Sequence, residues 1–157
     1  MRLKRNSYPQ PQALRGFTLI ELLVTITIAT ILVSIALPTY NNQVRKSRRS
    51  EAVATLLDMV GREERLFSTT NAYGTTPASL GYSGAAFPIS VGAGYYQVNV
   101  GVTAAAPPNP ATYQITATPI GSQAGDTQCA SFTVDQTGRR SALNGSGVDA
   151  TQTCWGS

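Results

Sequence analysis

Glu21 is the one charged residue in an apolar run that extends from Phe17 to Leu37. A charged side chain at the centre of a membrane-spanning helix costs about 2.5–3.5 kcal/mol on insertion scales. A carboxylate in such a run needs either access to water or a positive partner, because an unpaired buried charge is strongly destabilising. The chemistry that Glu21 offers is therefore ion pairing, and its partner must come from outside the run.

The cysteines and the missing histidines limit the other chemistry of the chain. It contains Cys129, Cys154 and no histidine. An even number of cysteines in a chain that looks exported favours a disulfide, with two buried free thiols as the alternative. Without histidine and without a C-x-x-C pair, we expect no metal site and no histidine-based catalytic pair. We therefore predict a protein that is not an enzyme and has no cofactor.

The positive charge of the chain is concentrated before the apolar run. The sequence has 12 basic and 8 acidic residues. Four of the basic residues precede Phe17, namely Arg2, Lys4, Arg5 and Arg15. From Phe17 onward, eight basic and eight acidic side chains balance. The net positive charge of the chain therefore comes from the leader, residues 1–16. The rest of the chain has no net charge and so no general attraction for nucleic acid.

The run of residues 17–37 is long enough to cross a bilayer as a helix. An ordinary secretory signal, cleaved after the small-x-small pattern Ser34-Ile35-Ala36, is the alternative. The run is longer than a usual signal core, and Glu21 lies where such a core is most apolar. A membrane-spanning helix is therefore favoured.

Beyond Pro38 the apolar residues recur every three or four positions, as in an amphipathic helix. The apolar members of this stripe are Ala52, Leu56, Met59, Val60 and Phe67, and Glu63 falls at the same spacing. We expect one helix from Phe17 to about Ser68, bent at Pro38, which removes an internal hydrogen bond. Residues 69–94, rich in Thr, Gly, Ser, Ala and Pro, are expected to form a long surface loop.

Three stretches of alternating apolar and polar residues follow, and each predicts a half-buried strand. Their inward residues are Tyr96, Val98 and Val100, then Tyr113, Ile115 and Ala117, then Ala130, Phe132 and Val134. The turn DQTG (135–138) leads to a fourth strand, 139–143. The prediction is an α+β fold: a long N-terminal helix packed on a four-stranded antiparallel sheet. Residues 144–153 have few apolar side chains, so we expect Cys154 alone to hold them.

Several segments together resemble type IV pilins over nearly all of residues 15–157. The likeness begins with Gly16 and FTLIEL (17–22), then continues in LPTY (37–40), YQITATP (113–119), FTVDQTG (132–138) and the paired cysteines. The C-terminal pattern is similar to type IVa pilins. The segments SEAVATLL (50–57) and REERLFS (62–68), with the terminal CW, most resemble PilE-type minor pilins.

The resemblance implies that a prepilin peptidase cuts between Gly16 and Phe17 and N-methylates the new amine of Phe17. It implies a cleaved leader (1–16), a transmembrane and filament-core helix half (17–37), and an amphipathic half with a periplasmic or extracellular globular domain (38–157). The precursor would span the inner membrane once and later join an extracellular pilus. Its expected partners are other pilin subunits, in homo- and hetero-assembly, the peptidase and an inner-membrane assembly platform.

Within this resemblance, Glu21 is expected to act in assembly. Cleavage gives Phe17 an α-amine whose reference pKa is about 8, so it is mostly protonated at neutral pH. The carboxylate of Glu21 would dock on the Phe17 amine of a staggered neighbour, as the family is thought to use this glutamate. The alternative is a helix-end charge that reaches the headgroups and stabilises the helix dipole.

The basic cluster Arg45, Lys46, Arg48 and Arg49 follows the apolar run. We expect these side chains to contact anionic headgroups or acids of neighbouring subunits, with DNA phosphates as the less favoured alternative.

The predicted function is that of a minor subunit of a type IV pilus, supporting pilus biogenesis, adhesion, twitching motility or DNA uptake. One alternative is a DNA-binding pilin of a natural-transformation uptake pilus, although the sheet offers only Arg139 and Arg140 as cations. The other is a type II secretion pseudopilin, a class that usually lacks the C-terminal disulfide.

Overall fold

The computed structural model describes residues 16–156, and apart from Gly16 the predicted leader lies outside them. The chain divides into two compact units between Tyr40 and Asn41. Helix α1 (Leu19–Thr70) begins in the first unit and continues in the second. It was predicted over 17–68, so both ends lie two residues further along the chain. Pro38 lies inside α1, and the bend expected there stays a prediction.

The part of α1 in the first unit exposes its apolar side chains. Leu19 is 85% exposed and Ile35 is 65% exposed. Hydroxyl groups in this stretch donate to carbonyl oxygens of the preceding turn, at 2.6 Å for Thr25, 2.9 Å for Thr27 and 2.8 Å for Thr30. These hydroxyls therefore present no unsatisfied polar group to a lipid environment. By length and composition α1 can cross a membrane, and its most apolar window has no buried residue, unlike the core helix of a soluble protein.

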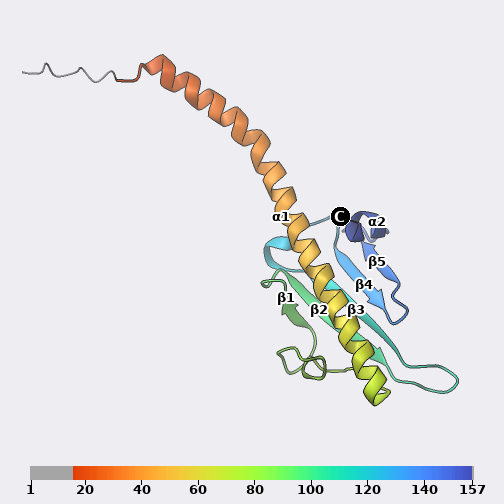
Figure 1. The fold of residues 1–157 in the computed structure, drawn as a ribbon. Helices are drawn as coiled ribbons and strands as arrows, with labels where there is room; N and C mark the ends of the chain where they lie inside the picture. The colour runs from red at the N-terminus through yellow and green to blue at the C-terminus, as the bar shows by residue number, and fades with distance from the viewer. Residues whose placement is uncertain (1–15, 157) are drawn as a thin grey trace, which may run out of the picture. The chain divides into compact units, whose positions relative to one another are not determined.

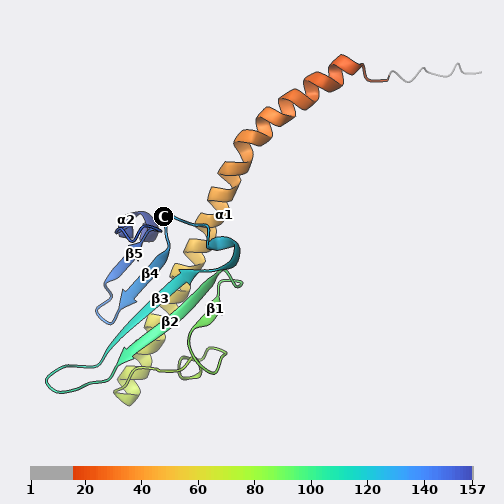
Figure 2. The ribbon, with the colours of Figure 1, turned by 180° about the vertical axis from the view of Figure 1, so that it is seen from behind.

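The second unit is a five-stranded antiparallel sheet in the order β1-β2-β3-β4-β5, with α1 across one of its faces (Figures 1 and 2). The strands are β1 (Ile89–Val91), β2 (Tyr96–Thr103), β3 (Thr112–Pro119), β4 (Ser131–Asp135) and β5 (Arg140–Leu143). The predicted α+β fold, a long helix on a meandering sheet, is confirmed.

The prediction of four strands, with a long surface loop over 69–94, is wrong about this loop, which contains a fifth strand and a short helix. Ile89 pairs with Val98 and Val91 pairs with Tyr96, which adds β1 at the sheet edge. The same segment contains a short 3-10 helix, η1 (Ala78–Leu80), whose Leu80 is buried. A three-residue strand between Pro88 and Gly92 offers too short an alternation to be recognised in the sequence.

The predicted apolar faces meet in one core. Val98 pairs with Ala117, Ala117 with Phe132, and Phe132 with Ala142, so one row of inward side chains crosses four strands. From α1, the fully buried apolar side chains are Ala52, Leu56 and Met59. Burial of this shared surface is the main favourable term for the fold of the second unit.

The C-terminal residues are attached at more points than expected. Cys129 and Cys154 form the predicted disulfide, with an S–S distance of 2.05 Å. Helix α2 (Thr151–Trp155) is also hydrogen-bonded to β5: Thr151 Oγ1 accepts from the Ala142 amide at 3.0 Å, and Trp155 Nε1 donates to the Ser141 carbonyl at 2.8 Å. The expectation that Cys154 alone holds the tail is therefore wrong.

Cys154→Ser should lower the free energy of unfolding of the globular unit (residues 41–157) by about 2–5 kcal/mol. The hydrogen bonds of Thr151 and Trp155 should keep α2 partly in place, so hydrogen exchange should rise most in residues 144–150. Denaturant titration and amide exchange measure the two effects. A variant as stable as the parent would show that the disulfide adds nothing to the other contacts.

Candidate functional site

The N-terminal motif occupies the start of α1. Gly16 and Phe17 precede the helix, and Glu21 lies in its first turn. The hydroxyl of Thr18 accepts a hydrogen bond from the Glu21 amide at 3.3 Å, as a helix N-cap does. Thr18 and Glu21 have the T-x-x-E spacing of a capping box. This spacing is visible in the sequence, but the docking role of Glu21 was predicted without it.

No contact within residues 16–156 requires a glycine at position 16. A Cβ atom placed on Gly16 would have no heavy atom of the described residues within 4 Å. The Glu21 side chain is exposed and makes no ion pair with any residue in the range 16–156. Neither residue is therefore explained by contacts within this part of the chain.

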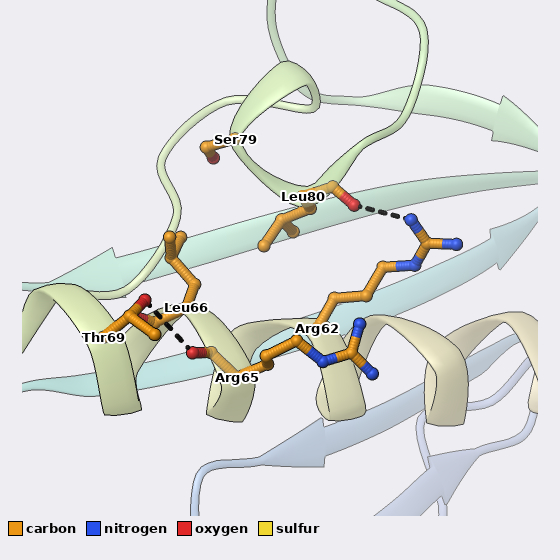
Figure 3. Close-up of a pocket in the computed structure, with 6 residues that line it drawn as sticks. All are labelled: Arg62, Arg65, Leu66, Thr69, Ser79 and Leu80. Atoms are coloured by element: carbon orange, nitrogen blue, oxygen red, sulfur yellow. Dashed lines mark hydrogen bonds between the residues drawn. The ribbon is translucent and has the colours of Figure 1, made fainter.

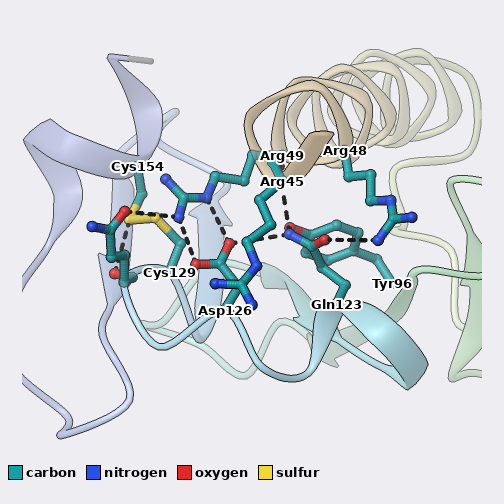
Figure 4. Close-up of polar contacts among 9 residues, drawn as sticks. Arg45, Arg48, Arg49, Tyr96, Gln123, Asp126, Cys129 and Cys154 are labelled. Atoms are coloured by element: carbon teal, nitrogen blue, oxygen red, sulfur yellow. Dashed lines mark hydrogen bonds and ion pairs between the residues drawn. A yellow bond between two sulfur atoms is a disulfide. The ribbon is translucent and has the colours of Figure 1, made fainter. Parts of the chain in front are cut away.

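Arg49, one of the four predicted surface cations, is buried. Its Nε and Nη2 atoms donate to the two carboxylate oxygens of Asp126, at 2.6 Å and 2.5 Å, and it is 4% exposed. Its Nη2 also donates to Oε1 of Gln128 at 3.1 Å. The expectation of headgroup or subunit contacts for Arg49 is therefore wrong, because this bidentate pair holds the guanidinium inside the fold (Figure 4).

Arg48 is partly engaged in the same region. It donates to Ser122 Oγ at 3.1 Å and to Gln123 Oε1 at 3.4 Å, and its guanidinium lies 3.6 Å from the ring centroid of Tyr95. The buried Gln123 in turn donates to the Asp126 carboxylate and the Tyr96 hydroxyl. These contacts fasten η2 (Gly121–Gln123) and the loop after it to α1.

Arg45 and Lys46 are the cations of that cluster for which no ion pair or side-chain hydrogen bond is found within residues 16–156. The ion pairs among residues 16–156 are Arg49–Asp126 and Arg62–Asp58. Arg45 and Lys46 line a pocket together with Asn42, Arg49, Thr127 and Gln128. The two lining side chains without an ion-pair partner within the described residues therefore give this pocket a positive charge.

A second polar cluster fastens the segment before β1 to α1. The carboxylate of Asp58 pairs with Arg62, four positions further along α1, at 2.8 Å and accepts a hydrogen bond from the Tyr82 hydroxyl. The Tyr82 bond is the main cause that lowers the pKa of Asp58. Arg62 also donates to the Leu80 carbonyl at 2.9 Å, beside the shallow pocket in Figure 3.

Glu63 is a buried acid without a cationic partner within the described residues. Its Oε2 accepts from the Gly74 amide at 2.7 Å, whereas its Oε1 has no hydrogen-bond partner within these residues. Burial raises the pKa of Glu63, the charge of Glu64 adds to that rise, and the Gly74 amide opposes it. Nearby, Tyr73 stacks on Phe67 and meets Tyr113 edge-on.

Glu63→Gln should flatten the dependence of stability on pH. The pKa of Glu63 is raised in the folded state, so folding takes up a proton, and stability falls as pH rises from the ordinary carboxyl pKa through the raised one. We expect Glu63→Gln to gain about 1–2 kcal/mol over the parent at neutral pH and to converge with it in acid. Denaturation of the globular unit from pH 4 to 8 measures this, and parallel curves would contradict it.

The remaining candidate cations lie at the turn between β4 and β5. Arg139 is exposed, and the Arg140 guanidinium lies 5.2 Å from the centroid of Trp155. The carboxylate of Asp135 accepts from the amides of Thr137 and Arg139 and closes this turn. Within residues 16–156, no group of three or more His, Cys, Asp or Glu side chains is arranged to hold a metal.

Sequence reasoning did not find Asp126, Gln123 or Glu63 as parts of these clusters. Asp126 is 77 positions from Arg49, and nothing in one sequence pairs residues so far apart. Glu63 lies on the predicted apolar stripe. A carboxylic acid at a position that the periodicity assigns to the core was the signal that could have indicated a buried acid.

A long apolar helix, a meandering antiparallel sheet on its second part and a C-terminal disulfide are the features of the pilin class. The model of a family described as "Type IV minor pilin ComP, DNA uptake sequence receptor" matches residues 38–133, more than half of the chain. The model of the prokaryotic N-terminal methylation motif matches residues 14–37. The chain belongs to this family of type IV minor pilins. The finer resemblance to PilE-type pilins stays a prediction.

Two curated relatives match shorter segments. The chain is 33% identical over 69 residues to the type IV major pilin protein PilA of Myxococcus xanthus (strain DK1622), covering 44% of this chain and 31% of the relative. It is 54% identical over 41 residues to the fimbrial protein EcpC of Eikenella corrodens, covering 26% of this chain and 27% of the relative. The matches thus span less than a third of each relative's length.

Proposed function

We propose that this chain is a minor pilin that is processed after Gly16, anchored in the inner membrane through residues 17–37, and assembled with other pilin subunits into an extracellular type IV pilus. The observation that carries the proposal is the adjacency of the two family matches, methylation motif and minor pilin, along one chain. The exposed apolar surface of α1 supports it, because such a surface needs lipid or other helices as its surroundings.

Processing between Gly16 and Phe17 is supported by the local structure. The bond precedes the first turn of α1, and no contact with the described residues requires glycine at position 16. A glycine without a role in the fold is understandable if a peptidase selects it. The new amine of Phe17 would then lie at the exposed end of the apolar segment, where N-methylation and ion pairing are accessible.

Docking of Glu21 on a neighbour's Phe17 amine is supported by the lack of a partner for this carboxylate within the described residues. In a packed filament core an unpaired charge would cost several kcal/mol, so the pair would also fix the register between subunits. The first-turn position of Glu21, with Thr18 as cap, supports the alternative role at the helix dipole.

DNA contact during uptake is a second function, favoured by the description of the matching family. The globular unit carries eight basic and seven acidic side chains, so any attraction for duplex DNA must come from local patches. Lys46, Arg65, Arg139 and Arg140 are the exposed cations of this unit. Lys46 and Arg65 are 19 positions apart on α1, and Arg139 and Arg140 lie at the turn between β4 and β5. This distribution favours weak binding with a strong dependence on salt.

Location in purified pili is the experiment that tests the proposed function. The protein should be present in sheared pili at a small fraction of the major subunit. If it stays with the cell envelope while pili form normally, the secretion pseudopilin becomes the better assignment.

Duplex DNA binding, measured on the detergent-solubilised chain at about 50 and 150 mM salt, tests the second function. No binding at the lower salt would contradict it.

A further inference from the structure

The pocket beside Arg45 and Lys46 is a built site rather than a loose group of surface charges. Arg49 is part of its lining, and hydrogen bonds to Asp126 and Gln128 hold the guanidinium of Arg49 in place. The residue directly after Gln128 is Cys129, which forms the disulfide with Cys154. The pocket has a volume of about 330 Å³, near the lower end of the ~300–1,000 Å³ of small-ligand sites.

The donors of the pocket suit an anion with several oxygens. A Cβ atom at Gly125 would lie 3.5 Å from Nη2 of Arg45, and Figure 4 shows the Arg45 side chain reaching from α1 toward the loop of Asp126. The carboxylate of Asp126 already accepts from Arg49 and Gln123. Asp126 therefore leaves Arg45 and Lys46 without an ion pair inside the described chain.

Neutral donors complete the lining. Because Oε1 of Gln128 accepts from Arg49, the amide group of Gln128 keeps its two N–H donors for another partner. Thr127 and Asn42, whose side chains can also donate hydrogen bonds, line the same pocket. Two cations with three neutral donors match the oxygens of a phosphate group better than the two oxygens of a carboxylate.

We propose that this pocket binds the phosphate of an anionic membrane phospholipid while the precursor is anchored. The proposal rests on the membrane anchoring in the proposed function. Asn42 follows Leu37, the last residue of the apolar run, by five positions, which is at most about 18 Å of chain. Anchoring through residues 17–37 therefore keeps the pocket close to the headgroup layer, whatever the arrangement of the two units.

A duplex DNA is the less suitable occupant. DNA binding relies on several phosphates contacted along a line, whereas this pocket encloses two free cations. Arg139 and Arg140 belong to the turn between β4 and β5, at the end of β4 opposite to the loop that carries Asp126 (Figure 1). They do not extend the charge of the pocket.

Lipid retention by the full chain in a neutral detergent tests the proposal. Native mass spectrometry would compare phosphatidylglycerol with phosphatidylcholine at equal mole fractions. We expect the parent to retain phosphatidylglycerol preferentially and Arg45→Gln/Lys46→Gln to bind it about 30-fold more weakly, from the effect of two basic residues at an anionic surface. The matched control, Arg139→Gln/Arg140→Gln, loses the same charge and should stay within threefold of the parent.

Gln128→Leu separates a pocket from simple surface charge, because it removes a neutral donor and no charge. We expect a several-fold loss of phosphatidylglycerol. Equal losses in the two charge-reduced variants, or no effect of Gln128→Leu, would overturn the proposal. So would a short duplex DNA that binds the parent through Arg45 and Lys46 when phosphatidylglycerol does not. A parent without lipid preference that still enters pili would overturn the lipid site alone and leave the proposed function intact.

Discussion

Glu21→Ala should accumulate in the inner membrane as a processed chain and be missing from sheared pili. If the carboxylate docks on a neighbour's Phe17 amine, its loss leaves that amine unpaired in the filament core. Breaking a buried ion pair from one side typically costs about 3–5 kcal/mol, which corresponds to a 10²–10⁴-fold loss of incorporation. Insertion itself should not suffer, because the substitution removes a charge from the apolar run. Immunoblots of membrane and sheared-pilus fractions measure both effects.

Two further variants separate docking from a role at the helix end. Thr18→Ala removes the cap at the start of α1, an effect of about 0.5–2 kcal/mol on the helix, but keeps the carboxylate. If Glu21 docks, Thr18→Ala should enter pili far better than Glu21→Ala, and Glu21→Asp should show an intermediate defect because its side chain is shorter. Normal incorporation of Glu21→Ala, or equal defects in Thr18→Ala and Glu21→Ala, would contradict the docking role.

Arg49→Met should destabilise the globular unit by about 3–5 kcal/mol, the usual cost of leaving one partner of a buried pair uncompensated. Asp126 is 1% exposed, and after the substitution only the neutral amide of Gln123 would remain to donate to it. Because a well-packed apolar replacement of both partners is often neutral, Arg49→Met/Asp126→Leu should recover much of the loss. Urea denaturation of residues 41–157 gives these free energies.

The exposed pair on the same helix is the control. The side chains of Arg62 and Asp58 are 37% and 52% exposed, so Asp58→Asn should change stability by no more than about 1 kcal/mol. If Arg49→Met were as mild as Asp58→Asn, the loop that carries Asp126 would be held by the disulfide and the core without help from the ion pair.

The strand faces and the amphipathic part of α1 were predictable because their periodicities are local. Val98 and Ile115 alternate with polar neighbours in the sequence, and both are fully buried in the structure. The disulfide followed from the number of cysteines, because no other pairing was available. The packing of the Ala52 stripe on the sheet followed in turn, since these were the two apolar faces of the unit.

The polar clusters could not be predicted, because their members come together through the fold. Arg45, Lys46, Arg48 and Arg49 read as one group of cations, yet only the fold shows that Arg49 faces inward to Asp126. The short strand β1 was missed because its three residues pair with β2 through backbone atoms. The sequence does not show which edge of the sheet is available for such pairing. The tail contacts of Trp155 depend on the position of β5 in the same way.

Intact-mass spectrometry of the protein in sheared pili tests most directly whether this chain is a processed pilus subunit. We expect a single species that begins at N-methylated Phe17 and carries the disulfide between Cys129 and Cys154. Replacing Gly16 with tryptophan should leave an uncut precursor in the membrane, with the globular unit folded as before. A mature chain that begins at Leu37, or the absence of the protein from pili that assemble normally, would contradict the proposed function.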